Sequence, residues 1–402
     1  MKVVLVNTKT PGGALVACKR LYDALKKQGI EVSLVEIKAS KWNFFWERFC
    51  IWVANHFSRK NLFAVSIANT GTDISKLPEI QAADIIHLHW INQGGVSLNT
   101  IAQLQALGKP IVWTMHDMWP FTGICHHAYE CTRYHERCGL CHLLNKPSTK
   151  DISYKTLQIK KNLYSSYIHY VAVSSWLQEK AVSSPLVKNV ITIPNTLDTS
   201  VFSFQDKREA RCFYNLPADK KIIIMGASKL NDPIKGFQFL REALAYLKTP
   251  EKICLCVFGN IKNEPQFLDG LPVQVVWINR SFTPNDLAKL YAAADVTVVS
   301  SLYETFGQTL SESLACGTPV VSFDNSGQTD IVVHKKNGYL AKWKDAYDLA
   351  RGIDFVLSNS FDVKELRNEA VSKYSESVVA NQYIALYQSL FTIVENENNR
   401  KN

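Results

Sequence analysis

The sequence lacks any run of about 18 consecutive apolar residues, the length that a helix needs to cross a bilayer. Its apolar start, residues 2–6, is too short and too quickly interrupted to be a signal peptide. We therefore expect a cytoplasmic protein, either free or on the inner face of the cytoplasmic membrane. Because thiols stay reduced in that compartment, the ten cysteines are not expected to form a general disulfide framework.

The glycine spacing of a nicotinamide-binding turn is also missing. The turn after the first expected strand contains Gly12 and Gly13 but not the pattern G-x-G-x-x-G. A glycine pair lets a phosphate or an acceptor approach the backbone closely, although such a pair more often forms only a turn. Gly13 is therefore a candidate binding residue for the phosphate of a donor substrate, and a nicotinamide cofactor is disfavoured.

The composition is that of an ordinary soluble enzyme. With 402 residues, 47% hydrophobic and 20% charged, the chain is long enough for two or three domains. Its net charge of +9 favours anionic partners. Nucleic acid, an acidic membrane surface and a nucleotide diphosphate are all compatible with that charge.

Short β-branched runs alternate with helical patterns along most of the chain. Residues 2–6, 14–28 and 31–36 have strand, helix and strand patterns and predict a βαβ unit. A second series of this kind starts at 221–225, after a linker at 194–198. The alternation predicts an α/β protein with two doubly wound halves. The expected domains are residues 1–193, residues 194–374 and an amphipathic helix in residues 375–402.

Two glutamates stand in a distinctive context. Glu304 and Glu312 are eight positions apart, with Gly307 between them and a Gly-Thr-Pro sequence at 317–319. If residues 309–316 are helical, the loop with Glu304 leads into a helix N-terminus, where backbone N–H groups and the dipole favour a phosphate. Carboxylates accept hydrogen bonds from sugar hydroxyls. The arrangement predicts a pocket for a sugar joined to a phosphate.

This stretch resembles the E-x7-E signature of retaining glycosyltransferases of family 4, which have the GT-B fold. The resemblance implies two Rossmann-like domains with a cleft between them and a last helix that crosses back to the first domain. It also implies transfer of a sugar from a nucleotide-diphosphate donor, with UDP or GDP, to a glycan or lipid-linked acceptor. The setting it suggests is bacterial polysaccharide biosynthesis.

The resemblance assigns roles to residues near the signature. Glu312 would bind the ribose, and Glu304 would approach the donor sugar. Lys235, before Gly236, matches the lysine that grips the donor diphosphate. Lys229 stands where the family more often has an arginine, and it lacks the bidentate geometry of a guanidinium. Backbone amides near the phosphates and the sugar would come from Phe306, Gly307 and Gln308.

His116 is the candidate catalytic residue of the first domain, together with Glu304 and Lys235 of the second. In related enzymes a histidine at this position contacts the donor sugar near the reacting carbon, and Asp117 would orient its imidazole. His87 and His89 alternate on a strand and should share one face. We favour packing or acceptor contact over a metal pair for them. No metal or other cofactor is expected for the chemistry, because the leaving diphosphate itself helps to deprotonate the acceptor.

A cysteine-rich loop lies at 125–142. Cys138 and Cys141 have the C-x-x-C spacing of a zinc knuckle, and Cys125 and Cys131 could complete a Cys₄ site. We favour a structural zinc ion that staples the loop. Free or transiently oxidised thiols and disulfides are the alternatives.

Residues 41–53 are unusually rich in aromatic side chains, with Arg48, Arg59 and Lys60 nearby. Trp and Phe interleaved with cations are typical of a membrane interface. A helix that simply packs on the first sheet explains the pattern equally well.

Two other functions, one enzymatic and one not, are alternatives to a glycosyltransferase. A nucleotide-sugar epimerase or a phosphorylase with the GT-B fold is the enzymatic alternative, although a phosphorylase should carry a cofactor lysine that the sequence does not identify. A zinc-loop protein that binds nucleic acid is the non-enzymatic alternative. It leaves Glu304 and Glu312 without a role, and no basic or stacking motif repeats. We therefore expect no nucleic-acid partner.

Overall fold

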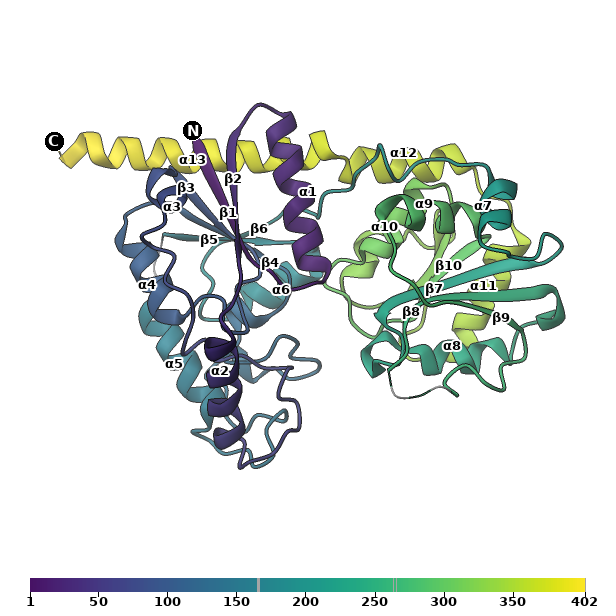
Figure 1. The fold of residues 1–402 in the computed structure, drawn as a ribbon, viewed down its shortest axis with the longest axis horizontal. Coiled ribbons are helices and arrows are strands. Elements are labelled where there is room, and N and C mark those ends of the chain that lie inside the picture. The colour runs from purple at the N-terminus through teal and green to yellow at the C-terminus, as the bar shows by residue number, and fades with distance from the viewer. Residues whose placement is uncertain (165–166, 263, 265, 402) are drawn as a thin grey trace. The chain divides into compact units, whose positions relative to one another are not determined.

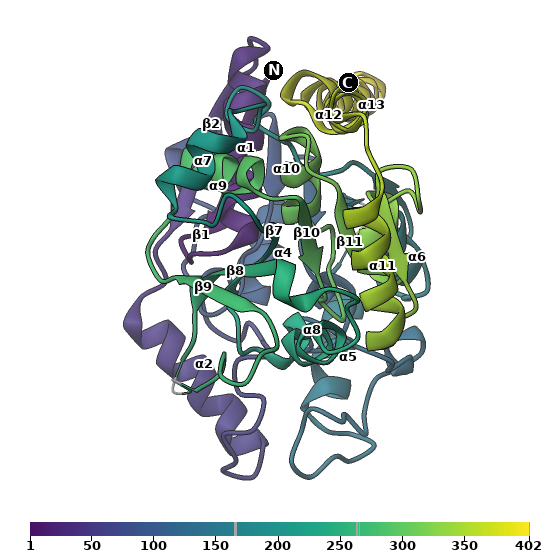
Figure 2. The ribbon, with the colours of Figure 1, turned by 90° about the vertical axis from the view of Figure 1, so that its right-hand side faces the viewer.

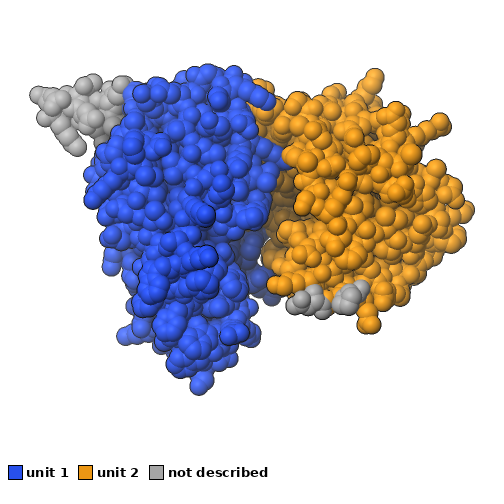
Figure 3. Space-filling model, in the orientation of Figure 1, with its two compact units in different colours: residues 1–194, 379–402 blue, residues 195–378 orange. Residues whose placement is uncertain are grey.

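The computed structural model describes residues 1–164, 167–262, 264 and 266–401, and it divides into two compact units (Figures 1 and 3). Unit 1 comprises Met1–Pro194 and Val379–Asn402, and unit 2 comprises Asn195–Val378. No helix in these described ranges is both long and apolar enough to cross a bilayer.

Unit 1 contains a parallel sheet of six strands among the described residues, in the order β2-β1-β3-β4-β5-β6. Its central strands are apolar runs because helices cover both faces, as the complete burial of Val4 to Val6 in β1 illustrates. The strands are β1 (Lys2–Thr8), β2 (Glu31–Ile37), β3 (Ile85–Leu88), β4 (Ile111–Met115), β5 (Ile168–Ala172) and β6 (Val190–Thr192). The helices are α1 (Gly13–Lys27), α2 (Lys41–Ala54), α3 (Pro78–Ala82), α4 (Leu98–Ala106), α5 (Ile152–Leu163) and α6 (Ser175–Val182), with short 3₁₀ turns at Trp119–Phe121 and Arg133–His135.

The last helix, α13 (Glu376–Lys401), returns the chain to unit 1 (Figure 1). Val379, Ala380, Tyr383 and Tyr387 are buried in the same core cluster as residues of β1, β3 and β4.

Unit 2 contains a second parallel six-stranded sheet in the described residues, in the order β12-β11-β10-β7-β8-β9. Its strands are β7 (Lys221–Lys229), β8 (Ile253–Asn260), β9 (Gln274–Ile278), β10 (Val296–Val299), β11 (Val320–Phe323) and β12 (Gly338–Ala341). The helices are α7 (Lys207–Phe213), α8 (Phe237–Leu244), α9 (Pro284–Ala293), α10 (Gln308–Ala315), α11 (Ala346–Ser358) and α12 (Val363–Tyr374), with 3₁₀ turns at Pro233–Lys235, Pro250–Lys252 and Ser326–Asp330.

The helices of unit 2 cover both faces of its sheet (Figure 2). Alternate strand residues such as Ile223 and Val298 share a core cluster with α8 and α11. Thr297, on the opposite face, accepts a hydrogen bond from Ser313 of α10 at 2.8 Å. The fold class predicted from the sequence, α/β with two Rossmann-like halves, is confirmed.

In each sheet the strand order reverses beside the first strand of the unit. The reversal lies between β1 and β3 in unit 1, and between β7 and β10 in unit 2. Doubly wound sheets bind ligands at the carboxyl ends of the strands next to such a reversal. The residues that follow β1, β3, β4, β7 and β10 are therefore expected to bind the ligand.

Candidate functional site

Lys235 and Glu304 meet at the carboxyl edge of the sheet in unit 2. Lys235 ends the 3₁₀ turn that follows β7, and Glu304 lies in the loop that follows β10. Lys235 Nζ donates a hydrogen bond to Glu304 Oε1 at 2.7 Å. The two side chains are 28% and 22% exposed, so a ligand at this edge can reach both charges.

Gly236 makes this approach of the two loops possible. It has a left-handed backbone with φ of 64°, and a Cβ atom there would lie 2.0 Å from the carbonyl oxygen of Ser300. The same two loops are joined by a backbone hydrogen bond, in which the Leu302 N–H donates to the carbonyl oxygen of Ile234 at 2.8 Å. Any side chain at position 236 would push these segments apart and displace Lys235.

The contact keeps Lys235 charged. Burial acts to lower the pKa of Lys235, but the charge and hydrogen bond of the Glu304 carboxylate outweigh burial and raise it. The lysine is therefore an ammonium at neutral pH. Such a pair can reorganise on binding, with the ammonium turning to a diphosphate and the carboxylate to a sugar hydroxyl.

The loop around Glu304 is held by a second loop. The Glu304 N–H donates to Ser326 Oγ at 3.0 Å, and the Gly327 N–H donates to the Glu304 carbonyl oxygen at 2.8 Å. A Cβ atom on Gly327 would lie 2.3 Å from the carbonyl oxygen of Thr305, so the two loops pack backbone against backbone. These contacts fix the main chain from which the Glu304 carboxylate extends.

Helix α10 begins directly after this loop. Its N-cap is Gly307, whose φ of 103° is one that L side chains rarely adopt, and its first helical residue is Gln308. The Phe306 side chain is buried edge-on against Tyr374, with ring centroids 5.4 Å apart. Phe306 therefore anchors the loop, and the positive end of the helix dipole follows directly after the loop that carries Glu304.

Glu312 occupies the second turn of α10 and is almost completely buried. The Tyr291 hydroxyl donates to Glu312 Oε2 at 3.0 Å. Burial first, and the negative charge of Glu312 second, raise the pKa of Tyr291 well above its usual value. The tyrosine therefore stays a hydrogen-bond donor that holds this carboxylate in one position.

Lys229 is the last residue of β7, and its side chain is exposed. Its backbone pairs with Asn260 after an irregularity in the register of β7 and β8. The described structure thus unites Lys235 with Glu304 and leaves Lys229 at the surface of the same sheet edge.

In unit 1, His116 directly follows β4 and is half-buried. Its Nε2 shares a hydrogen bond with Nδ1 of His89, which follows β3, at 2.9 Å, and the two rings stack with centroids 5.2 Å apart. Burial lowers the pKa of His116 to about 4. The imidazole is therefore neutral at physiological pH and acts as a hydrogen-bonding group, not as a cation.

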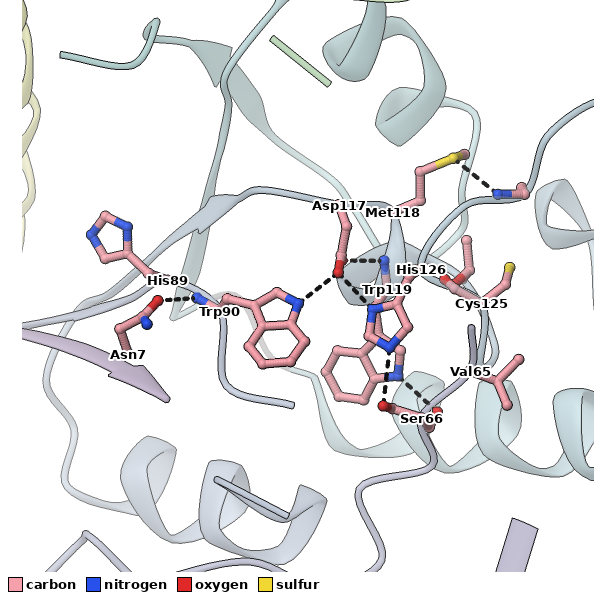
Figure 4. A network of polar contacts seen from close by, with 12 residues as sticks. Asn7, Val65, Ser66, His89, Trp90, Asp117, Met118, Trp119, Cys125 and His126 are labelled. Atoms are coloured by element: carbon pink, nitrogen blue, oxygen red, sulfur yellow. Dashed lines mark hydrogen bonds and ion pairs between the residues drawn. The ribbon is translucent and has the colours of Figure 1, made fainter. Parts of the chain in front are cut away.

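Asp117 also takes part in a second network. Its Oδ2 accepts hydrogen bonds from Trp90 Nε1 at 2.8 Å and His126 Nδ1 at 2.6 Å (Figure 4). Its negative charge acts to raise the pKa of His116, so its expected role in orienting His116 stays a prediction. Burial acts to raise the pKa of Asp117, but His126 more than compensates and lowers it. His89 positions the His116 ring through their 2.9 Å hydrogen bond.

The far nitrogen of His126 continues this network. Its Nε2 shares a hydrogen bond with Ser66 Oγ at 3.0 Å, and the indole N–H of Trp119 donates to the Ser66 carbonyl oxygen at 2.8 Å (Figure 4). Serine, histidine and aspartate in this order resemble a nucleophilic triad. Ser66 is completely buried, however, so the network positions the loop after His116 and does not attack a substrate.

His87 of β3 and His89, directly after that strand, lie side by side, as expected, with ring centroids 4.3 Å apart. His87 shares hydrogen bonds of 2.7 Å with the hydroxyls of Tyr387 in α13 and Thr114 in β4. Burial lowers the pKa of His87 to about 3. The neutral His87 therefore ties the last helix to the strands that present His89 and His116.

Gly13 begins α1 immediately after the β1 turn, and the N-cap Gly12 provides no side-chain cap. A Cβ atom on Gly12 would meet nothing within 4 Å, so the glycine pair leaves open space above this helix end.

Two family models match the chain and together span most of it. The model described as Glycosyltransferase Family 4 matches residues 11–201, and the model described as Glycosyl transferases group 1 matches residues 206–376. This chain is a GT-B glycosyltransferase of the family 4 type.

Known proteins resemble this glycosyltransferase along almost its whole length. An uncharacterised glycosyltransferase of Methanocaldococcus jannaschii is 23% identical over 96% of this chain and 98% of the relative. The structure of a glycosyltransferase of Rickettsia africae covers 97% of this chain and 98% of its own, with a TM-score of 0.68 and 15% identity. Anabaena HepE, solved in complex with UDP and glucose, covers 97% and 100%, with a TM-score of 0.64 and 17% identity. At these identities the structural similarity establishes the fold.

The cysteine-rich loop of the glycosyltransferase holds free thiols. Burial raises the pKa of Cys125, although a hydrogen bond with Thr122 acts to lower it. Burial raises the pKa of Cys138 and Cys141 to about 11. In the described ranges, no group of three or more His, Cys, Asp or Glu side chains is placed as a metal site. The zinc site stays a prediction.

Sequence reasoning missed several residues that build the candidate site of the glycosyltransferase. Ser326 and Tyr291 orient Glu304 and Glu312 from distant segments, and no local spacing points to them. His126 gave a weak signal, because it stands in the loop that the cysteines drew attention to.

Proposed function

We propose that this glycosyltransferase transfers a sugar from a UDP- or GDP-activated donor to a glycan or lipid-linked acceptor in bacterial polysaccharide biosynthesis, with retention of anomeric configuration. The ion pair of Lys235 and Glu304 carries the proposal. It joins a cation suited to a diphosphate with a carboxylate suited to a sugar, at the sheet edge where doubly wound folds bind ligands. The binding of UDP and glucose by Anabaena HepE supports a nucleotide-sugar donor.

In the proposed reaction the bond between the anomeric carbon and the diphosphate oxygen breaks as the acceptor oxygen bonds to the same face of the sugar. The acceptor proton passes to the leaving diphosphate. Lys235 and the N-terminus of α10 stabilise the negative charge that develops on that diphosphate. Lys229, exposed at the same edge, adds a second positive charge.

The remaining residues position the donor. Glu304 accepts a hydrogen bond from a sugar hydroxyl, and Glu312, held by Tyr291, accepts one from the ribose. The neutral His116 donates to the sugar, because His89 fixes its other nitrogen. The backbone of Phe306, Gly307, Gln308 and Gly13 lines the donor site, and no divalent metal takes part in the chemistry.

A screen of nucleotide sugars for release of nucleoside diphosphate tests the donor class. Nucleoside diphosphate should be released from one of the nucleotide sugars and not from the others, and EDTA should not prevent its release. Its release should fall strongly in Lys235→Ala and Glu304→Ala. Lys207→Ala is the matched control, because Lys207 forms a 2.9 Å ion pair with Asp295 at the amino end of the same sheet. NMR of the product decides the stereochemistry, and an inverted anomeric centre would exclude the retaining mechanism.

A further inference from the structure

Helix α2 buries an ion pair and exposes aromatic side chains to solvent. The charged residues Glu47 and Arg48 in its middle are 0% and 5% exposed, whereas aromatic side chains cover its outer side. We define the aromatic face by seven exposed residues on α2 and just after it: Trp42, Phe45, Trp46, Phe49, Val53, Phe57 and Phe63. Figures 1 and 2 show α2 at the margin of unit 1, away from the centre of its sheet.

The buried charges hold α2 in this orientation. Glu47 and Arg48 form an ion pair at 2.9 Å. Glu47 Oε1 accepts the backbone N–H groups of Ile67 and Ala68 at 2.9 and 2.8 Å, and Arg48 Nη1 donates to the Val65 carbonyl oxygen at 2.9 Å. Turning the aromatic face inward would leave the buried backbone groups of Val65, Ile67 and Ala68 without their hydrogen-bond partners, at a substantial cost. The aromatic face is therefore a fixed outer surface.

The rings of this face form a continuous stripe. Trp42 and Trp46 stack with centroids 5.8 Å apart, and Trp46 and Phe49 stack at the same distance. The stripe continues through Trp52 to Phe57, at 6.0 and 4.8 Å. The spacing of three and four positions places the α2 rings on one side of the helix. A connected apolar surface of this kind marks an interaction site.

The charge around the stripe indicates the partner. Glu47 is the only acidic residue between positions 38 and 63, and it is buried in its ion pair. The cations Lys38, Lys41, Arg59 and Lys60 are all exposed. The charges that this segment presents to solvent are therefore positive. An isologous contact with a second copy would place these cations opposite the same cations of that copy. The repulsion between them disfavours a dimer through this face.

We propose that the aromatic face of α2 docks this protein on an anionic membrane surface. The Trp and Phe rings lie at the level of the lipid headgroups, and the four lysine and arginine side chains contact the lipid phosphates. The proposal does not depend on the transfer reaction, since docking is measured without a donor or an acceptor.

Sedimentation with lipid vesicles tests the proposal. The full chain should sediment with vesicles of phosphatidylglycerol and phosphatidylcholine in equal amounts, and less with phosphatidylcholine alone. Trp46→Ser/Phe49→Ser should weaken binding by about ten-fold or more, because two rings no longer enter the interface. Lys41→Glu/Lys60→Glu should abolish the preference for the anionic vesicles.

Matched controls come from unit 2. Tyr246→Ser/Tyr347→Ser removes two aromatic residues that are 49% and 59% exposed, and Lys252→Glu/Lys364→Glu reverses two exposed lysines. Both should bind vesicles as the wild type does. The proposal is wrong if the wild type stays in the supernatant, or if both α2 variants bind as well as the controls. It is also wrong if the wild type is a dimer without vesicle binding and Trp46→Ser/Phe49→Ser makes it monomeric, since a second copy would then cover the face.

Discussion

Lys235 and Glu304 are 69 positions apart in the sequence, yet their side chains form a 2.7 Å ion pair at the carboxyl edge of one sheet. The carboxyl ends of β7 and β10 are neighbours because the strand order of unit 2 reverses there. The pair therefore combines a positive charge for a diphosphate with a carboxylate for a sugar hydroxyl.

Removing either member of the pair should eliminate most of the activity while leaving the fold intact. We expect Lys235→Ala and Glu304→Ala each to lower kcat/KM by about a hundred-fold or more, as for other groups that stabilise a developing charge. Because both side chains are partly exposed, the free energy of unfolding should change by less than about 1 kcal/mol. Steady-state kinetics and urea unfolding measure the two quantities. Near-normal turnover in either variant would remove this pair from the site.

Gly236→Ala should damage the site through the backbone. Its φ of 64° strains an alanine, and the new Cβ would lie 2.0 Å from the Ser300 carbonyl oxygen. We expect a loss of about 1–3 kcal/mol in the free energy of unfolding, with a fall in activity because Lys235 moves. Gly270→Ala is the matched control, since Gly270 also has a positive φ but a Cβ there meets nothing within 4 Å. Equal stability of the two variants would contradict the account of the β7–β10 contact.

The buried histidines of unit 1 should make stability depend on pH. Burial lowers the pKa of His116 from 6.5 to about 4, so the folded chain binds fewer protons than the unfolded chain between these values. The contribution of His116 to the free energy of unfolding is complete above pH 6.5 and is lost as the pH falls toward 4. The slope is up to about 1.4 kcal/mol per pH unit for one histidine. His116→Gln should show a shallower dependence in urea unfolding. An unchanged slope would show that His116 is not buried as a neutral group.

The four thiols of the cysteine-rich loop should bind about one zinc ion per chain. Zinc would draw together Cys125, Cys131, Cys138 and Cys141. Elemental analysis of protein purified without a metal-affinity tag measures the content, and chelation should lower the thermal stability. Cys212→Ala, at an exposed cysteine outside the loop, should retain the metal. Metal-free protein with four reactive thiols in the loop would exclude the zinc site.

Much of the fold follows from local sequence. Strands buried on both faces must be apolar runs, so the alternation of such runs with helical patterns predicted both doubly wound sheets. The helix expected at residues 309–316 begins at Gln308, because Gly307 takes the left-handed backbone that starts it. Local spacing therefore located the loop of Glu304 and the helix of Glu312.

The contacts that complete the site could not be predicted in the same way. His89 orients His116, and Ser326 holds Glu304, through pairings of segments that only the folded sheets bring together. The contact between the Asp117 carboxylate and His126 is of the same kind, because no spacing in the sequence points to it.

The structure of the protein with bound UDP or GDP tests the central claim most directly. The account predicts that the diphosphate lies within hydrogen-bonding distance of Lys235 Nζ, which leaves Glu304, and that the ribose hydroxyls contact Glu312. A nucleotide bound elsewhere, with the ion pair of Lys235 and Glu304 intact, would contradict the claim.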